Sequence, residues 1–359
     1  MPVYRQNPLT GAWVIIAPDR ADRPGAAVAP GAAPAVRGAG REKNTPCPFC
    51  PGNERLTPPE LFAYRFDRSP PDAPGWSVRV VPNKYPAAVL DAAGVPSPEA
   101  VALQSRTATS PRAAVAIDRL LCVETPAVGQ HEVLVESPDH DACFALHPPA
   151  HAALVLDALR HRHRMLLHAR DVRYLVSIQN HGPASAATIP HPHFQTLAAA
   201  VVPPAAAAML DAQEAFAKKQ GRALFDVMLE EEQADGRRIV GANDDCVAFA
   251  PWASQWPYEV WIVPRQPVPF FAELPDDALP PLAELLRGVL RRIYERLADP
   301  PYNLVIHGGP RTLRAADHAR MFIQVLPRTA NFGGLELGAG LFINSVAPET
   351  AAAELREST

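Results

Sequence analysis

The segment His191-Pro192-His193-Phe194-Gln195 is the most informative stretch of this sequence. Residues two apart on a β-strand point to the same face, so we expect His191, His193 and Gln195 to line one wall. The strand is otherwise apolar, and each buried polar group without a partner costs roughly several kcal/mol. Two histidines hydrogen-bonded inside a core would explain an isolated pair. Here Asn180-His181-Gly182 and the small residues 185–188 precede the segment, which favours an anion-binding site.

The residue types of this segment are suited to phosphoryl chemistry. A neutral imidazole is nucleophilic near pH 7, so His193 can attack a phosphorus atom without losing a proton first. An acceptor phosphate is already an anion and needs no general base. Gln195 can donate a hydrogen bond to a phosphoryl oxygen, but it cannot give up a proton at neutral pH. The segment therefore predicts transfer between two phosphates in preference to hydrolysis.

The order of predicted elements repeats along the chain. In the first half, strands near 78–81 and 131–135 precede a helix over 150–169 and a strand over 174–178. In the second half the same order occupies 247–251, 258–263, 276–297 and 302–306. We predict an α+β fold of two duplicated halves, 1–200 and 201–359, with mostly antiparallel sheet and helices packed on it. Any two α+β halves look alike at this level of detail, so chance similarity is the alternative.

The bulk composition excludes several classes of function. The chain has 359 residues, 48% of them hydrophobic, and 34 basic against 38 acidic residues give a net charge of -4. This balance argues against nucleic acid as a partner. No apolar run approaches the roughly 20 residues that span a bilayer, and we expect a cytoplasmic protein without a membrane partner. The Ala/Gly/Pro-rich stretches 25–45 and 91–111 are expected to be loops.

Cys47-Pro48-Phe49-Cys50 is the second chemically informative motif. A Cys-x-x-Cys in a turn is either a metal clamp or a redox pair, and the absence of a thioredoxin-like βαβ pattern around it favours the metal. The remaining histidines are expected at the surface or in loose pairs; they are His131, His147, His161, His163, His168 and His181.

Further segments occur in the order found in one known family, and they are Asn7–Trp13, Ala17–Pro24, Cys47–Cys50, Val81–Pro86, Glu136–His140 and Pro251–Glu259. With His-Pro-His-x-Gln, they make the sequence resemble the galactose-1-phosphate uridylyltransferase branch of the histidine-triad superfamily. A lone His-x-His-x-Gln is a weak signal, whereas this ordered series is specific and covers nearly the whole chain. The resemblance implies two histidine-triad-like halves, of which the second has a degenerate motif.

The resemblance also implies roles for individual residues. His193 would become nucleotidylated, with Gln195 as its phosphate-contacting helper. Arg20 and Arg23 match arginines that meet the nucleotide phosphates, Asn83 matches a nucleoside contact, and Asn180 and Thr188 match contacts to phosphate. A structural zinc would bind to Cys47, Cys50, His140 and His191. Two thiolates and two imidazoles make a closed tetrahedral set, which would hold the strand of His191 and thereby direct His193.

The sequence departs from the family pattern in the second half. His307 matches one of the histidines that bind a second metal in some members, but Arg320 and Phe322 replace two others, so we expect no metal there. The loop 331–338 aligns with the segment that holds the hexose and keeps Glu336. Leu335 stands where galactose-specific members have a tyrosine, and the same stretch also resembles relatives that split ADP-glucose with phosphate. The base of the nucleotide and the identity of the sugar therefore stay open. The resemblance also implies a homodimer.

The residue types and the family resemblance together leave three classes of function. The first is a nucleotidyltransferase that moves a nucleoside monophosphate between a nucleotide sugar and a hexose 1-phosphate through His193, with a nucleotide-sugar phosphorylase as the same site using free phosphate. The second is a histidine-triad nucleotide hydrolase, against which Gln195 argues. The third is a non-catalytic nucleotide-binding protein, against which the intact His193 argues.

Overall fold

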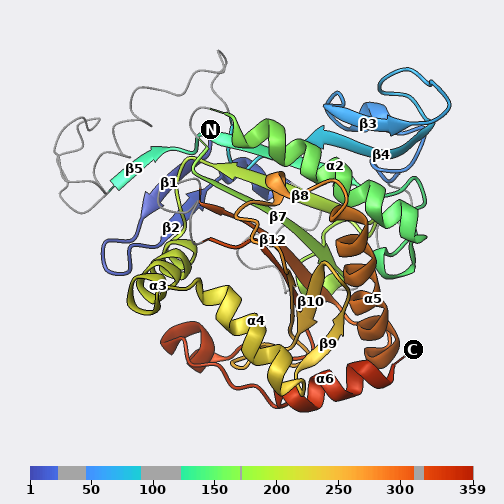
Figure 1. The fold of residues 1–359 in the computed structure, drawn as a ribbon. Coiled ribbons are helices and arrows are strands. Elements are labelled where there is room, and N and C mark those ends of the chain that lie inside the picture. Colours follow the sequence, from blue (N-terminus) through green and yellow to red (C-terminus); the bar gives the residue numbers. More distant parts are fainter. Residues whose placement is uncertain (23–45, 90–122, 170–171, 311–318, 359) are drawn as a thin grey trace.

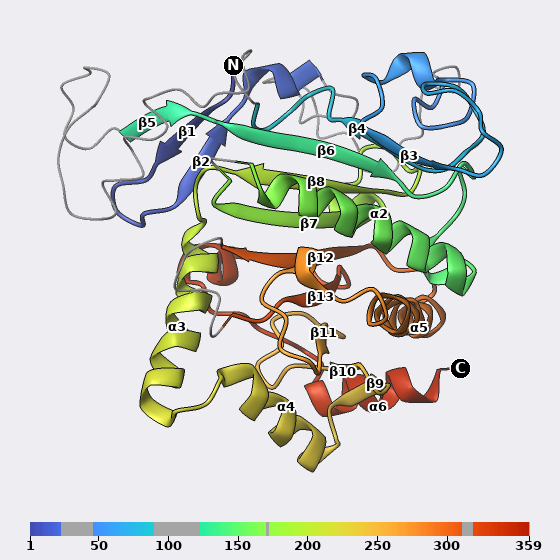
Figure 2. The ribbon, with the colours of Figure 1, turned by 45° about the horizontal axis from the view of Figure 1, so that its top comes forward.

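The computed structural model describes residues 1–22, 46–89, 123–169, 172–310 and 319–358. Its centre is an antiparallel sheet of ten strands in the order β3-β4-β6-β8-β7-β12-β13-β11-β10-β9 (Figure 1 and Figure 2). In chain order these strands are β3 Phe62–Arg65, β4 Trp76–Pro82, β6 Gly129–Val135, β7 Tyr174–His181, β8 His193–Ala199, β9 Ile239–Ala242, β10 Cys246–Phe249, β11 Val260–Pro264, β12 Tyr302–Pro310 and β13 Phe322–Pro327.

The strand order is symmetrical about the central pair β7 and β12. The first half supplies three strands, the helix α2 (Pro149–Leu167) and two more strands, and the second half supplies the same series around α5 (Leu279–Leu297). At the centre Ile178 pairs with Val305 and Asn180 with Asn303. The predicted α+β class with mostly antiparallel sheet is therefore confirmed. A division at residue 200 stays a prediction, because both halves share one continuous sheet.

Helices α2 and α5 cover one face of the sheet and lie against each other (Figure 2). On α5 the buried residues recur at spacings of three and four, as in Leu282, Leu286, Val289 and Ile293. The helix begins at Leu279, three residues later than Asp276, because its prolines fit only the first turn. The main core lies between these helices and the inward side chains of the strands, among them Phe194.

The opposite face of the sheet differs between the halves. Over the second half, Phe225 and Leu229 of α4 (Leu224–Asp235) pack on Val247, Phe249 and their neighbours. Over the first half lies the loop that contains Cys47–Cys50, here called the cysteine loop. It places Cys47 and Phe49 against Val81, Val133 and Val135. Among the described residues of the first half no α-helix covers this face, and the face is open to a cavity there.

The remaining elements lie around the large sheet. A second sheet has the order β2-β1-β5, with β1 Val3–Gln6, β2 Trp13–Ile16 and β5 Val123–Pro126. A short helical turn, Pro18–Asp22, follows β2 and carries Arg20. Helix α3 (Pro204–Gln220) connects the halves, and α6 (Pro348–Glu357) ends the chain. Among the described residues, no helix has the length and apolar character to cross a membrane.

Candidate active site

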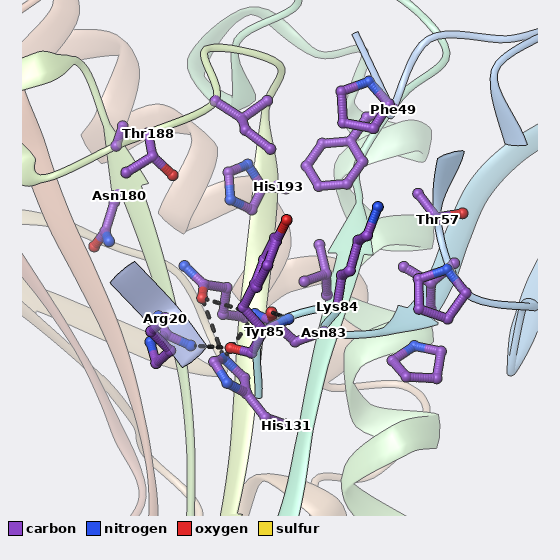
Figure 3. A pocket seen from close by; sticks show the side chains of 18 of the residues that line it. Arg20, Phe49, Thr57, Asn83, Lys84, Tyr85, His131, Asn180, Thr188 and His193 are labelled. Atoms are coloured by element: carbon purple, nitrogen blue, oxygen red, sulfur yellow. Dashed lines mark hydrogen bonds between the residues drawn. The ribbon is translucent and has the colours of Figure 1, made fainter. Parts of the chain in front are cut away.

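A cavity of about 470 Å³ lies on the open face of the first half. Its walls come from the strands β4, β6, β7 and β8, from the cysteine loop and from the loop after β7 (Figure 3). The polar and aromatic residues that line it are Arg20, Phe49, Thr57, Asn83, Lys84, Tyr85, His131, Asn180, Thr188, His193 and Gln195. Residues 186–188 also contribute to the lining, as expected for the small-residue stretch.

His193 lines this cavity with a neutral imidazole. Its side chain is only 8% exposed, and burial lowers the pKa of its imidazole. Its Nδ1 lies 2.8 Å from the backbone oxygen of His191. A carbonyl oxygen only accepts hydrogen bonds, so Nδ1 carries the proton and the lone pair is on Nε2. The imidazole therefore presents an unprotonated nitrogen for attack.

The expectation that His191 shares a wall with His193 and Gln195 is wrong. Strand β8 begins at His193, and the lining of the cavity includes His193 and Gln195 but not His191. Pro192 has no N–H with which to extend the strand ladder, so the alternation of side chains does not reach back to His191. The ring of His191 is fully buried and lies beside the cysteine loop instead.

The ring of His191 and three side chains around it, those of Cys47, Cys50 and His140, form a group that could hold a metal ion. The Cys50 sulfur lies 3.3 Å from Nδ1 of His140 and 3.7 Å from Nδ1 of His191, and the Cys47 sulfur lies 3.8 Å from the latter atom. These separations suit ligands of one tetrahedral ion. Nε2 of His191 lies 2.7 Å from the backbone oxygen of Ser137, so its proton is on Nε2 and Nδ1 is free to bind the metal.

Phe49 links the possible metal group to the cavity. It stands between the two cysteines, and its ring lies 5.2 Å from the ring of His193 and 6.1 Å from that of His191. Pro48 lines the cavity beside it. The turn that carries both thiols thus also forms a wall against the imidazole of His193.

Sequence reasoning misjudged three histidines. His131, His147 and His163 are 8%, 6% and 1% exposed, so the expectation of a surface position is wrong for them. His163 donates to or accepts from the hydroxyl of Ser177 at 2.7 Å, and burial lowers its pKa to about 3. His131 lines the cavity and contacts Gln195. Lys84 and Tyr85 also line it, although they drew attention only as part of the Val81–Pro86 segment.

The structure brings most of the other expected residues together. Arg20, Asn83, Asn180 and Thr188 all line the cavity. Arg20 also donates a hydrogen bond to the backbone oxygen of Tyr85 (Figure 3). Arg23 lies outside the described residues.

Glu336 is not among the residues that line the cavity. It accepts a hydrogen bond from the backbone N–H of Gly333, 2.9 Å away, within its own loop. Within one chain, Glu336 therefore does not line the cavity that contains His193.

The second half holds one residue of the cavity in place. At its own equivalent positions it carries different side chains. Nδ2 of Asn303 on β12 donates to Oδ1 of Asn180 at 2.8 Å, which turns the amide nitrogen of Asn180 away from β12. On β13, Phe322 is in the position of His193 and stacks on His307 with ring centroids 4.2 Å apart. Arg320 forms a 2.8 Å ion pair with Asp226. The predicted absence of a metal at His307 stays a prediction.

Comparisons with known proteins agree with this fold. A family model described as galactose-1-phosphate uridyl transferase, N-terminal domain, matches residues 99–203. The chain is 30% identical to ADP-glucose phosphorylase of Arabidopsis thaliana over 99% of this chain and 93% of that protein. It is 25% identical to galactose-1-phosphate uridylyltransferase of Thermotoga maritima over 99% and 98% of the two chains. The crystal structure of the Arabidopsis phosphorylase with bound ADP-glucose superposes with a TM-score of 0.73 at 28% identity, covering 100% of this chain and 99% of that one.

The metal group leads to a first prediction. We expect about one metal ion per chain in protein purified without chelator, and none in Cys50→Ser, because a hydroxyl is a poor replacement for a thiolate ligand. The variant should also unfold at lower temperature, since structural metal binding contributes to folding free energy. Elemental analysis and thermal melts measure both effects.

The matched control is Cys246→Ala, which removes a thiol from the core under α5. It should keep its metal even where its stability falls. Metal-free wild-type protein, or a Cys50→Ser variant that retains the ion, would contradict the assignment.

Proposed function

This chain belongs to the galactose-1-phosphate uridylyltransferase family, and we propose that it transfers a nucleoside monophosphate between a nucleotide sugar and a second phosphate through His193. The observation that carries the proposal is the neutral imidazole of His193, whose Nδ1–H is bound to the His191 carbonyl while Nε2 is available in a cavity. The enzyme is a nucleotidyltransferase of the hexose-1-phosphate uridylyltransferase type.

In the first step, Nε2 of His193 attacks the α-phosphorus of the nucleotide sugar. A phosphorus–nitrogen bond forms, the bond from that phosphorus to the bridging oxygen breaks, and sugar 1-phosphate leaves with the bonding electrons. The imidazole becomes cationic, and its Nδ1–H still donates to the carbonyl of His191, a contact that favours the charged ring. No proton has to move, because the leaving phosphate is a stable anion.

In the second step, a phosphate oxygen of the acceptor attacks the same phosphorus, the phosphorus–nitrogen bond breaks, and the neutral imidazole returns. Gln195 follows His193 by two positions on β8, so its side chain lies on the same side of the strand. We assign it the donation of a hydrogen bond to phosphoryl or leaving oxygens. An amide cannot deprotonate water, which disfavours hydrolysis of the intermediate.

The charges around the cavity suit a nucleotide ligand. Arg20 and Lys84 are cationic side chains in its lining, and the amide of Asn180 and the hydroxyl of Thr188 add uncharged donors. We propose that these four groups bind the phosphates and that Asn83 lies near the nucleoside. For Arg23 we propose the phosphate-binding role that the resemblance implies.

We further propose that the metal is zinc with a structural role. The set of two thiols and two imidazoles is complete without water, which is typical of structural zinc rather than of catalytic zinc. When bound, zinc would fix the cysteine loop and the ring of His191. The backbone oxygen of His191 would then hold His193 at the correct orientation.

A homodimer is supported by an exposed apolar segment next to Glu336. Leu337, Leu341 and Ile343 are 76%, 64% and 69% exposed, which is unusual for side chains so close in sequence. We propose that this segment packs on a second copy of the chain, with Glu336 reaching the hexose there.

A cytoplasmic location and the absence of a nucleic-acid partner stay predictions.

Two identities of the overall reaction are compatible with this site. Exchange between a nucleotide sugar and a hexose 1-phosphate is the first, and it would place the enzyme in galactose and related carbohydrate metabolism. Phosphorolysis of ADP-glucose is the second, and the similarity to the Arabidopsis phosphorylase favours it specifically. Both use the same first step at His193.

The covalent step leads to a second prediction. Wild-type protein mixed separately with UDP-glucose and ADP-glucose should gain the mass of UMP or AMP, and the better donor identifies the base. His193→Ala should form no adduct and lose roughly 10³-fold or more in turnover, while keeping its fold and metal, because His193 is not one of the ligands. Mass spectrometry of the intact protein measures the adduct.

His168→Ala is the matched control, since His168 is an exposed residue at the end of α2. It should form the adduct at the wild-type rate. If His193→Ala still exchanges label between sugar phosphate and nucleotide sugar at near wild-type rate, the covalent mechanism is wrong.

A third prediction concerns the acceptor. Leu335 replaces a tyrosine beside Glu336, and a site that lacks a hydroxyl-reading donor distinguishes sugar epimers poorly. We expect similar specificity constants for galactose 1-phosphate and glucose 1-phosphate, with free phosphate as a competing acceptor. Steady-state kinetics on preformed nucleotidyl enzyme would measure this. A thousandfold preference for galactose 1-phosphate, worth about 4 kcal/mol in transition-state binding, would show that another residue reads the sugar.

A further inference from the structure

Two side chains converge on the amide oxygen of Gln195. Nε2 of His131 on β6 lies 3.1 Å from Oε1 of Gln195, and Nδ2 of Asn83 lies 3.5 Å from the same oxygen (Figure 3). His131 and Gln195 stand on adjacent strands, where Leu197 pairs with His131 and Val133 with Gln195. The contact therefore runs diagonally across the strand pair, on the side that faces the cavity.

The protonation of His131 follows from its other ring nitrogen. The backbone N–H of Ala87 points at Nδ1 of His131, with nitrogens 3.1 Å apart. A backbone N–H can only donate, so Nδ1 must accept and cannot carry a proton. His131 is then a neutral imidazole with its proton on Nε2, and that N–H donates to Oε1 of Gln195.

Asn83 is oriented by the same kind of constraint. The backbone N–H of Tyr85 donates to Oδ1 of Asn83 at 2.9 Å, which turns the NH₂ group of Asn83 toward Gln195. Nδ2 of Asn83 and Nε2 of His131 are 3.2 Å apart and are both donors, so they share the Gln195 oxygen as their acceptor. A flipped amide would place the NH₂ of Gln195 against two N–H groups.

We propose that His131 is a positioning residue, which with Asn83 fixes the amide of Gln195 so that its nitrogen faces the phosphoryl group on His193. The inference rests on the proposed function, because the benefit arises only when a phosphorus atom is bonded to His193. His131 touches neither substrate nor the reacting nitrogen in this account. It sets which end of Gln195 the phosphate meets, and a preset donor stabilises transition-state charge without reorganisation.

A matched pair of variants separates this role from a structural one. In His131→Gln the amide nitrogen replaces Nε2 and can still donate to Gln195, but the acceptor for Ala87 is lost. In His131→Asn the amide oxygen replaces Nδ1 and still accepts from Ala87, but the donor to Gln195 is lost. We expect His131→Asn to lose roughly tenfold or more in kcat with little change in KM for the donor nucleotide sugar, and His131→Gln to stay within about threefold of wild type.

Single-turnover formation of the His193 adduct, with ADP-glucose and UDP-glucose as probes, gives the rates. The loss in His131→Asn should disappear in a Gln195→Ala background, since there is then no amide to orient. Equal rates in the two variants, or a larger loss in His131→Gln, would overturn the proposal while the wild-type adduct upholds the covalent mechanism. Absence of an adduct in wild-type protein would overturn both.

The tautomer of His131 provides a readout that needs no activity. Nitrogen-15 NMR of the free protein, assigned with the His131→Gln variant, should show a neutral ring with its proton on Nε2. A proton on Nδ1 would overturn the positioning role whatever the rates.

Discussion

The hydrogen bond from Nδ1–H of His193 to the backbone oxygen of His191 is the interaction on which the site depends. His191 makes three separate contacts: Nδ1 faces the thiols, Nε2–H donates to the carbonyl of Ser137, and its own carbonyl holds His193. A metal ion bound to this group would therefore act on His193 through the single residue His191, which carries both a possible ligand nitrogen and the carbonyl that holds His193. A shift of the cysteine loop would be transmitted directly to the direction of the His193 lone pair.

The different packing over the two halves of the symmetrical sheet explains why the proposed chemistry fits the first half. Each half offers an equivalent position at the start of its last strand, occupied by His193 in β8 and by Phe322 in β13. Over β13 the space is filled, since Phe225 of α4 and Trp261 pack their rings on Phe322. Over β8 it is left as a cavity. The second half contributes through Asn303 instead, which holds Asn180 across the central strand pair.

The sequence was sufficient for those features that depend on local pattern. Strand and helix positions followed from periodicity, and His193 with the four possible ligands followed from motif spacing and the family resemblance. The role of His131 could not be found that way, because its diagonal contact with Gln195 requires the register of β6 against β8. Helices α3 and α4 were not among the predicted elements, although Pro204 and Gly221 are typical boundaries of a helix such as α3. The grouping of His191 with Gln195 was wrong because strand β8 begins only after Pro192.

The central claim is that the carbonyl of His191 keeps the proton on Nδ1 of His193, so that Nε2 forms the bond to phosphorus. The most direct test is nitrogen-15 and phosphorus-31 NMR of the nucleotidylated protein, with labelled histidine. We expect phosphorus to couple to Nε2 of His193 and Nδ1 to retain its proton. A phosphorus bond to Nδ1, or to any other residue, would contradict it.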